Sequence, residues 1–314
     1  MVDSIIKWAG GKRQILDDIT SHFPKKYNNY HEPMIGGGAV FFSLEPKSGT
    51  INDINARLIN FYKKVRDCPK QLIELCKTFK HPESEPDPKR KFHNTNRKGK
   101  KIKNFYYQQR EIFNCRPNND EFNPLEEAAL FLYLNRTCYN GLYRENLSGE
   151  FNVPIGRYKN PNWVREKQIK MASLVLDKVK ICNKNFDYIL NYAKSGDLVY
   201  FDPPYVPMSI TANFTDYHAK GFNSQDQETL MKVAQKLDAK NVYVLISNSG
   251  VMCDFYKNKG FQVDIIEAKR SINSDPDNRG EVDEILASNI SPEKQRIKKK
   301  SYRKITSFAT KGKK

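Results

Sequence analysis

The amino-acid sequence predicts an α/β fold, in which a mostly parallel sheet flanked by helices is divided by an inserted, mainly helical domain. Two observations lead to this prediction. Short apolar runs of strand length alternate with longer helical patterns near both ends of the chain, as is typical of parallel sheets covered by helices. The middle of the chain lacks this alternation and is rich in charged residues, Asn and Gly.

Near the amino terminus the pattern predicts two strands and a helix. Residues 31–35 are predicted as a strand that leads into three consecutive glycines, and residues 50–53 as a second strand that ends on an acid. Residues 56–66 then have helical periodicity. Parallel strands joined by helices bring such strand ends together at one edge of a sheet, where α/β proteins bind their ligands.

The second half of the sheet is predicted after residue 165. Several apolar runs there have strand length, and residues 225–237 between two of them have helical periodicity. The predicted strands are residues 178–182, 197–201, 242–247, 263–267 and 284–290.

The segment between these halves has a different composition. Residues 81–104 are rich in Pro, Lys, Arg and Asn, which predicts a loop. Residues 125–135 predict a helix, and residues 135–158 are rich in Gly, Asn and Arg. The predicted division is a sheet domain of residues 1–59 and 166–290, an inserted domain of residues 60–165, and a tail of residues 291–314.

The chain carries a large positive charge. Its 314 residues have a formal net charge of +17, and the segment from Pro292 onward holds ten Lys or Arg residues against one Glu. A surplus of this size favours a polyanionic partner, because basic side chains release counterions from phosphates. About half of the surplus lies in the tail, so charge alone favours nucleic acid only in part. The tail either adds sequence-independent affinity for DNA or is a solvated extension.

The cysteines and the apolar runs exclude several classes of protein. The six cysteines are scattered without a Cys-x-x-Cys pair, which argues against a zinc site or a disulfide framework and favours reduced thiols. No signal-like segment and no run long enough to span a bilayer are present. The sequence therefore predicts a cytoplasmic protein with no membrane partner and no metal.

The glycine run predicts a ligand site. Gly36, Gly37 and Gly38 follow the first strand and let a ligand approach the backbone closely. Asp53 ends the second strand, where nucleotide-binding folds place an acid that binds ribose hydroxyls. The spacing differs from the Gly-x-Gly-x-x-Gly dinucleotide motif, so a nucleoside ligand without a pyrophosphate fits better. A tight turn with a helix-capping Asp is the structural alternative.

A second motif, residues 202–205, directly follows the apolar strand of residues 198–201. Asp202 offers an anionic acceptor, Pro203 a backbone carbonyl in a proline-constrained turn, and Tyr205 an aromatic face. This set suits methyl transfer to an aromatic amine such as adenine N6, which is a poor nucleophile. Two acceptors on its hydrogens favour tetrahedral nitrogen, the carboxylate stabilises the developing positive charge, and the ring holds an unstacked base.

With these motifs the chain resembles a known family, the alpha group of DNA adenine-N6 methyltransferases, whose Dam-like members act on GATC. The resemblance extends to about residue 290 and rests on motifs in the family's order. The matching segments are residues 7–12, 32–42, 52–55, 135–158 and 202–205.

The resemblance implies a Rossmann-like sheet that binds S-adenosyl-L-methionine, with a target-recognition domain at residues 60–165. The implied cofactor-binding residues are Trp8, Lys12, Gly36, Gly37, Gly38, Asp53, Asn185, Phe186 and Asp202. The chain departs from the family at two of its motifs. Met34 replaces the usual Phe of the glycine motif, and Asn185 replaces an Asp that contacts the cofactor adenine. An amide oxygen also accepts hydrogen bonds, so we expect weaker cofactor affinity at most.

The resemblance also implies a DNA-binding surface on double-stranded DNA. The implied residues are Tyr139, Asn140, Leu142, Arg144, Pro154 and Arg157. Arg144 is the best candidate for a bidentate contact to guanine in the major groove. Leu142 is suited to wedge into the base stack, and Tyr139 to replace a displaced base. An ordinary polar hairpin is the alternative for this segment.

The predicted reaction is direct transfer of the methyl group, in line, to a flipped adenine. Asp202 and the Pro203 carbonyl accept the amino hydrogens while Tyr205 stacks on the base, and positioning supplies much of the rate. Cytosine-C5 transfer would need a Cys preceded by Pro, which this chain lacks. N4-cytosine enzymes more often begin the tetrapeptide with Ser, and RNA or protein amide methyltransferases with Asn.

Two further alternatives are the same chemistry at another target sequence and a DNA-binding relative that has lost catalysis. A nuclease is disfavoured, because no metal-binding acidic cluster is present. The sequence leaves open the source, which is prokaryotic or a phage, the oligomeric state, and whether a cognate restriction endonuclease exists.

Overall fold

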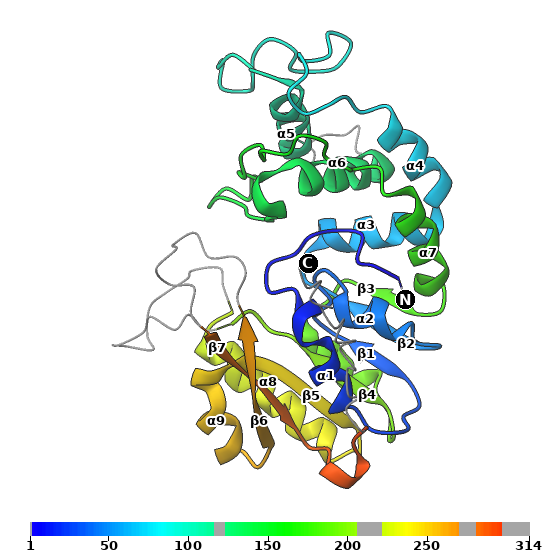
Figure 1. Ribbon diagram of the computed structural model, residues 1–314, viewed down its shortest axis with the longest axis vertical. Helices are drawn as coiled ribbons and strands as arrows, with labels where there is room; N and C mark the ends of the chain where they lie inside the picture. The colour runs from blue at the N-terminus through cyan, green and yellow to red at the C-terminus, as the bar shows by residue number, and fades with distance from the viewer. Residues whose placement is uncertain (1, 116–122, 206–221, 270–280, 297–314) are drawn as a thin grey trace, which may run out of the picture.

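The computed structural model describes residues 2–115, 123–205, 222–269 and 281–296 (Figure 1). Within these ranges seven strands form one sheet in the order β3-β2-β1-β4-β5-β7-β6. Strands β1 to β5 run parallel to one another, whereas β7 runs antiparallel to both β5 and β6. The predicted α/β class is confirmed. The strands are β1 (Tyr30–Glu32), β2 (Gly49–Asn52), β3 (Lys180–Cys182), β4 (Leu198–Phe201), β5 (Tyr243–Ser249), β6 (Gln262–Lys269) and β7 (Glu281–Ser288).

The first strand is shorter than the sequence predicts. β1 ends at Glu32 rather than at residue 35. Pro33 has no N–H to donate to a strand ladder, and the N–H of Ile35 donates instead to the carbonyl oxygen of Asn52, at 2.9 Å. The chain therefore turns immediately after β1, at the edge of the sheet where the glycine run follows.

The sheet separates two hydrophobic cores, and β4 shows how the sequence builds both. Side chains alternate between the faces of a strand. Leu198 and Tyr200 belong to the first core, whereas Val199 and Phe201 belong to the second. All four side chains are buried, which explains why this strand is a continuous apolar run.

The described residues contain nine α-helices. Helices α1 to α7 contribute to the first core, and α8 and α9 to the second. The helices are α1 (Leu16–Ser21), α2 (Ala39–Leu44), α3 (Ala56–Asp67), α4 (Pro69–Lys77), α5 (Phe105–Cys115), α6 (Pro124–Thr137), α7 (Glu166–Leu176), α8 (Ser224–Asp238) and α9 (Cys253–Asn258).

The regular elements of residues 60–165 within the described ranges are helices, joined by long irregular segments. Helix α3 contacts both α6 and α7, and α4, α5 and α6 lie beyond α3 on the side away from β6 and β7 (Figure 1). The Phe61 and Phe131 ring centroids are 5.4 Å apart, so α3 and α6 pack closely. The first core is continuous from the sheet into α6. Residues 81–104 form the predicted loop above α5.

None of the helices in the described residues is long and apolar enough to cross a membrane. No cluster of three or more His, Cys, Asp or Glu side chains in the same ranges is placed to hold a metal ion.

Candidate active site

One buried amide ties three strand ends together. Asn52, the last residue of β2, donates from Nδ2 to the carbonyl oxygens of Pro33 and Lys184, both at 2.9 Å. Its Oδ1 accepts from the Lys184 N–H at 2.8 Å. Since Pro33 follows β1 and Lys184 follows β3, these bonds fix the three strand ends against one another. Asn52 belongs to the motif of residues 52–55, but no role was predicted for it from the sequence.

The glycine turn lies on this edge, against Trp8. Gly36 and Gly38 have φ values of +46° and +67°, in the region that favours glycine. A Cβ atom on Gly36 would lie 2.8 Å from Cδ1 of Trp8, and one on Gly37 would lie 2.8 Å from Cβ of Trp8. The turn and the indole are therefore in direct contact, as the sequence prediction of a shared site requires.

Asp53 completes the glycine turn. Its Oδ2 accepts from the Gly36 N–H at 3.0 Å, and its Oδ1 accepts from the Asn55 N–H at 2.9 Å. Burial raises the pKa of this carboxyl group, whereas the backbone N–H bonds lower it. Each carboxylate oxygen has two lone pairs, so Asp53 can accept further hydrogen bonds from a ligand's hydroxyls. The neighbouring Ile54 side chain is largely exposed, and the sequence analysis did not single it out.

The tetrapeptide lies at the end of β4 and is organised by a buried lysine. Lys12 Nζ is 2.9 Å from Asp202 Oδ1 and 2.7 Å from the Gly10 carbonyl oxygen, and it lies 4.5 Å from the ring centroid of Tyr205. The Lys12 side chain is 4 % exposed and that of Asp202 is 23 % exposed. Removing Lys12 would leave Asp202 without its counter-charge in a partly buried site. The predicted residues Lys12, Asp202 and Tyr205 are thus brought together.

Two residues that were not predicted from the sequence, one on β5 and one on β7, hold residues 202–205 in place. Ser247 of β5 donates from Oγ to Asp202 Oδ1 at 2.9 Å. Glu284 of β7 accepts a hydrogen bond from the Tyr205 hydroxyl at 2.8 Å. Burial, and then the charge of Asp202, raises the pKa of Tyr205, so this hydroxyl stays protonated and can donate. Pro203 is buried between Asp202 and the exposed Pro204.

The remaining predicted cofactor residues lie after β3. Asn185 is exposed at the start of a short 3-10 helix, and Phe186 is buried with its ring centroid 5.9 Å from that of Phe222. Asn183, two residues before Asn185, donates to the carbonyl oxygen of Asp53 at 2.7 Å. This bond ties the loop that carries Asn185 to the Asp53 segment.

The predicted DNA-contacting residues lie on an irregular hairpin that follows α6. Its arms pair through bridges between Cys138 and Ile155 and between Glu145 and Phe151. Tyr139, with 46 % exposure, is the most accessible aromatic side chain of the hairpin. The other exposed residues of the predicted set are Asn140, Arg144, Pro154 and Arg157, and Leu142 is half-buried.

The hairpin is attached directly to the amino-terminal motif. Asn135 of α6 donates from Nδ2 to the carbonyl oxygens of Lys7 and Gly141, at 2.8 Å and 3.2 Å, and accepts from the Lys7 N–H at 2.9 Å. The Trp8 and Tyr143 rings stack with centroids 5.4 Å apart and an interplanar angle of 20°. The sequence analysis assigned no role to Asn135 or Tyr143, yet they join the glycine turn to the hairpin.

Arg144 is held at the exposed side of this hairpin. Its Nε donates to Asn152 Oδ1 at 2.8 Å, and the Asn152 N–H donates to its carbonyl oxygen at 3.1 Å. In the part of the chain that the structure describes, neither terminal nitrogen of this guanidinium has a hydrogen bond. The side chain is therefore positioned and can offer its terminal N–H groups to a partner.

Comparison with known proteins decides the family. The model of the D12 class N6 adenine-specific DNA methyltransferases matches residues 8–272, which include the glycine turn, the hairpin and the tetrapeptide. The chain belongs to this family. It is thus an adenine-specific DNA methyltransferase that uses S-adenosylmethionine.

Full-length relatives agree with the family match. The type II methyltransferase M1.LlaDCHI of Lactococcus lactis subsp. cremoris is 40% identical over 285 residues, covering 90% of this chain and 94% of the relative. The type II methyltransferase M.MjaIII of Methanocaldococcus jannaschii is 39% identical over 289 residues, covering 88% and 95%. The DNA adenine methylase of Escherichia coli K12 is 36% identical over 284 residues, covering 90% and 94%.

The close contact of Gly36 with Trp8 gives a testable prediction for this methyltransferase. We expect Gly36→Ala to weaken S-adenosylmethionine binding by roughly tenfold or more, because a methyl group there both strains the positive φ and displaces the indole. Isothermal titration calorimetry measures the effect. Gly260→Ala is the matched control, since Gly260 has φ +88° and open space around the added Cβ. Equal losses of affinity in both variants would contradict this account.

A buried acid beneath the site gives a pH prediction. Glu32, only 2 % exposed, accepts a hydrogen bond from the Tyr30 hydroxyl at 2.7 Å. Burial, reinforced by the charge of Asp202, raises the pKa of Glu32 from 4.5 to about 8. Between these values the folded state binds more protons than the unfolded state, so this group's contribution to stability falls as the pH rises.

The Glu32→Gln variant has no carboxyl group at this position, so it lacks this pH-dependent contribution to stability. We expect the unfolding midpoint of the variant, relative to that of the wild type, to rise steadily between pH 4.5 and about 8 and then level off. Thermal unfolding across this pH range measures the difference. Glu85→Gln, the same change at an exposed glutamate that forms no ion pair within the described residues, is the control for the substitution itself. A pH-independent difference for Glu32→Gln would show that Glu32 does not titrate in this window.

Proposed function

We propose that the enzyme methylates N6 of adenine within GATC in double-stranded DNA, with Asp202, Pro203 and Tyr205 as its catalytic residues. The observation that carries this proposal is the position of Asp202. Its carboxylate is fixed by Lys12 and Ser247 at the end of β4, on the edge of the sheet that also holds the glycine turn. An acceptor for an amino group and the cofactor pocket thereby share one edge.

In the proposed reaction the target adenine leaves the base stack and enters beside Tyr205. Asp202 and the Pro203 carbonyl accept the two hydrogens of its amino group, which frees the nitrogen lone pair to attack. The Asp202 carboxylate then stabilises the positive charge that develops on nitrogen. Tyr205 is held in place by Glu284 and by Lys12, so its ring offers a fixed surface for stacking.

S-adenosylmethionine would supply the methyl group from its positively charged sulfur, whose bond to the methyl carbon breaks so that S-adenosylhomocysteine leaves, and the methylated nitrogen would then lose one proton to solvent. We propose that Asp53 accepts hydrogen bonds from its ribose, that the glycine turn lets it approach the backbone, and that Ile54 offers an apolar face to its adenine. The other residues assigned to this pocket are Trp8, Lys12, Asn185, Phe186 and Asp202. The direct contact of Trp8 with Gly36 and the tie between Asn183 and Asp53 support this grouping.

We further propose that residues 60–165 recognise the target through the hairpin. The exposure of most of its predicted residues supports this assignment, since a contacting surface must be accessible. The assigned residues are Tyr139, Asn140, Leu142, Arg144, Pro154 and Arg157. GATC rests on the Dam-like pattern of residues 135–158 and on similarity to the DNA adenine methylase of Escherichia coli. A cognate restriction endonuclease is part of the same proposal, since two relatives are named type II methyltransferases.

A panel of duplexes tests the target. We expect methyl transfer to a duplex with one GATC site, and a kcat/KM that is lower by roughly 5- to 150-fold after any single base-pair change in that site, since each mismatch costs about 1–3 kcal/mol. A duplex with the four bases in scrambled order controls for composition. Faster transfer to another sequence would overturn GATC while leaving the adenine chemistry intact.

A further inference from the structure

The loop above α5 contains a second small hairpin, formed by residues 94–102. A bridge pairs Thr95 with Lys101, and the Ile102 N–H donates to the Asn94 carbonyl oxygen at 2.8 Å. The Asn96 N–H donates to the Lys100 carbonyl oxygen at 2.9 Å and closes the turn. This segment and the adjoining Lys103, together called the basic hairpin, lie outside every motif that was connected with function from the sequence.

The hairpin that follows α6, residues 138–155, is here called the recognition hairpin, and the turn of the basic hairpin has the same hydrogen bonds as its tip. Asn96 begins one turn and Asn146 the other. In each, the Asn Oδ1 accepts from the backbone N–H groups two and four residues later, at 2.9–3.0 Å. The glycine three residues later, Gly99 or Gly149, has a φ of +71° or +73°. Two rigid turns of one design therefore lie at the tips of two hairpins.

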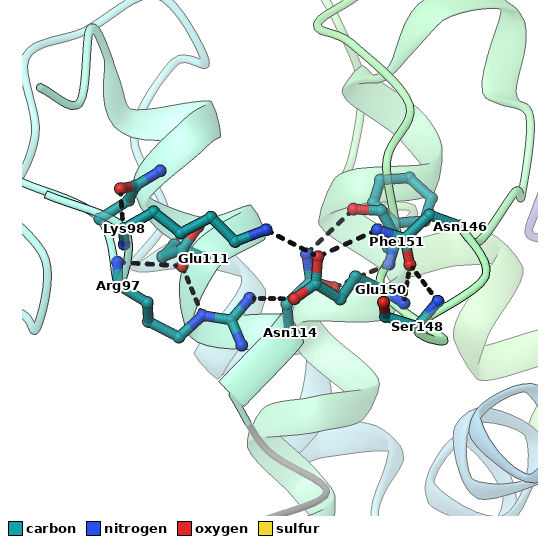
Figure 2. Close-up of polar contacts among 9 residues, drawn as sticks. Arg97, Lys98, Glu111, Asn114, Asn146, Ser148, Glu150 and Phe151 are labelled. Atoms are coloured by element: carbon teal, nitrogen blue, oxygen red, sulfur yellow. Dashed lines mark hydrogen bonds and ion pairs between the residues drawn. The ribbon is translucent and has the colours of Figure 1, made fainter. Parts of the chain in front are cut away.

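Ion pairs hold these two tips side by side (Figure 2). Arg97, in the basic hairpin, donates from Nη2 to Glu150 Oε1 of the recognition hairpin at 3.0 Å. Lys98 Nζ lies 3.8 Å from the other oxygen of Glu150. The Arg97 Nε and backbone N–H both donate to Glu111 of α5, which is 11 % exposed. Arg97 thus joins the basic hairpin both to α5 and to the hairpin that carries Arg144.

The other basic side chains of the basic hairpin have no acidic partner within the described residues. Arg97 and Lys98 offset the charge of Glu150, but Lys100, Lys101 and Lys103 are exposed and form no ion pair within the residues that the structure describes. These lysines give one short, exposed segment a positive charge that attracts a polyanion. Duplex DNA is the polyanion that the recognition hairpin is proposed to contact.

We propose that the basic hairpin is a second DNA-binding finger, whose Lys100, Lys101 and Lys103 contact the phosphates that flank the recognised site. Such contacts position a protein on the duplex and carry no sequence information of their own. The Arg97–Glu150 ion pair holds the basic hairpin beside the recognition hairpin, which carries Arg144. This inference rests on the proposed function only in taking duplex DNA as the substrate; it does not depend on GATC.

A charge-matched pair of triple variants tests the finger. The test variant is Lys100→Gln, Lys101→Gln and Lys103→Gln. The control is Lys232→Gln, Lys236→Gln and Lys257→Gln, which removes three exposed charges from α8 and α9. Affinity for a GATC duplex and for a scrambled duplex is measured by fluorescence anisotropy over a range of salt concentrations.

The account predicts a shallower salt dependence for the test variant alone. Each lost phosphate contact reduces the slope of log K against log salt by about 0.9, so a reduction of roughly 2 to 3 is expected on both duplexes. The ratio of the two affinities should stay as in the wild type. A slope equal to that of the control variant would overturn the proposal, and so would a loss confined to the GATC duplex.

A second measurement separates this inference from the target assignment. Shortening the duplex on both sides of the site should remove the difference between the test variant and the wild type, because the flanking phosphates are lost. An undiminished difference on the shortest duplex that still binds would show that the lysines do not contact the flanks. If GATC proves to be the wrong target, both measurements still report on the finger, since neither requires methyl transfer.

Discussion

Asp202→Asn is expected to lower kcat for methyl transfer by about two to three orders of magnitude, the size of effect that follows loss of one preorganised electrostatic contact. The amide keeps an acceptor oxygen but has no charge to stabilise the developing cation. It also leaves the buried Lys12 without its counter-ion at 2.9 Å. Single-turnover measurements with labelled S-adenosylmethionine give the rate of the chemical step directly.

The control for this variant is Asp254→Asn, the same change on the exposed side of α9. It should leave the rate within experimental error of the wild type. If Asp202→Asn instead raises KM for DNA with kcat unchanged, Asp202 contributes only to ground-state binding. A rate near that of the wild type in both variants would show that Asp202 has no role in the chemical step.

The second large effect is expected at Arg144. Arg144→Lys keeps the positive charge but loses the planar fork that binds guanine through two hydrogen bonds. We expect discrimination against a changed G·C pair in the target to fall by about 1–3 kcal/mol, or roughly 5- to 150-fold in the ratio of kcat/KM values. Arg144→Ala should lose the same discrimination and, in addition, some affinity for every duplex.

This comparison separates recognition from general attraction. Kinetics on the GATC duplex and on duplexes changed at the G·C pairs give both quantities. Retention of wild-type discrimination in Arg144→Lys would show that Arg144 binds a phosphate and does not read a base. In that case another exposed residue of the hairpin, such as Arg157, becomes the first candidate for the base contact.

The parts of the site that the sequence predicted are those fixed by parallel strands. Gly36 and Asp53 follow neighbouring strands, and the carboxyl ends of parallel strands share one edge, so their contact could be predicted from strand order. Asp202 follows β4, which is the other neighbour of β1. These relations need only the alternation of strands and helices and the motifs at the strand ends.

The residues that the sequence did not reveal depend on register or on packing. Glu284 reaches Tyr205 because β7 is inserted antiparallel between β5 and β6 and pairs Glu284 with Ser249. A one-residue slip of that strand would turn Glu284 to the other face, and no local pattern fixes the register. Asn135 is a polar residue in an apolar helix, and only the path of Lys7 past α6 shows what its amide binds.

The same limit applies to the two hairpin tips. The pattern of an Asn followed three residues later by a Gly occurs at Asn96 and at Asn146, and it is visible in the sequence. What the sequence does not show is that the two turns lie side by side through Arg97 and Glu150, which are 53 residues apart. Long-range ion pairs on a surface have no sequence signal comparable to strand periodicity.

The most direct test of the account is chemical analysis of the product. The enzyme is given S-adenosylmethionine labelled in its methyl group and an unmethylated duplex with a single GATC site, and the digested DNA is analysed by mass spectrometry. The account predicts label only in N6-methyladenine, only from the GATC duplex, and none with Asp202→Ala. Label in another base, or equal labelling by Asp202→Ala, would contradict the assignment of the reaction to this site.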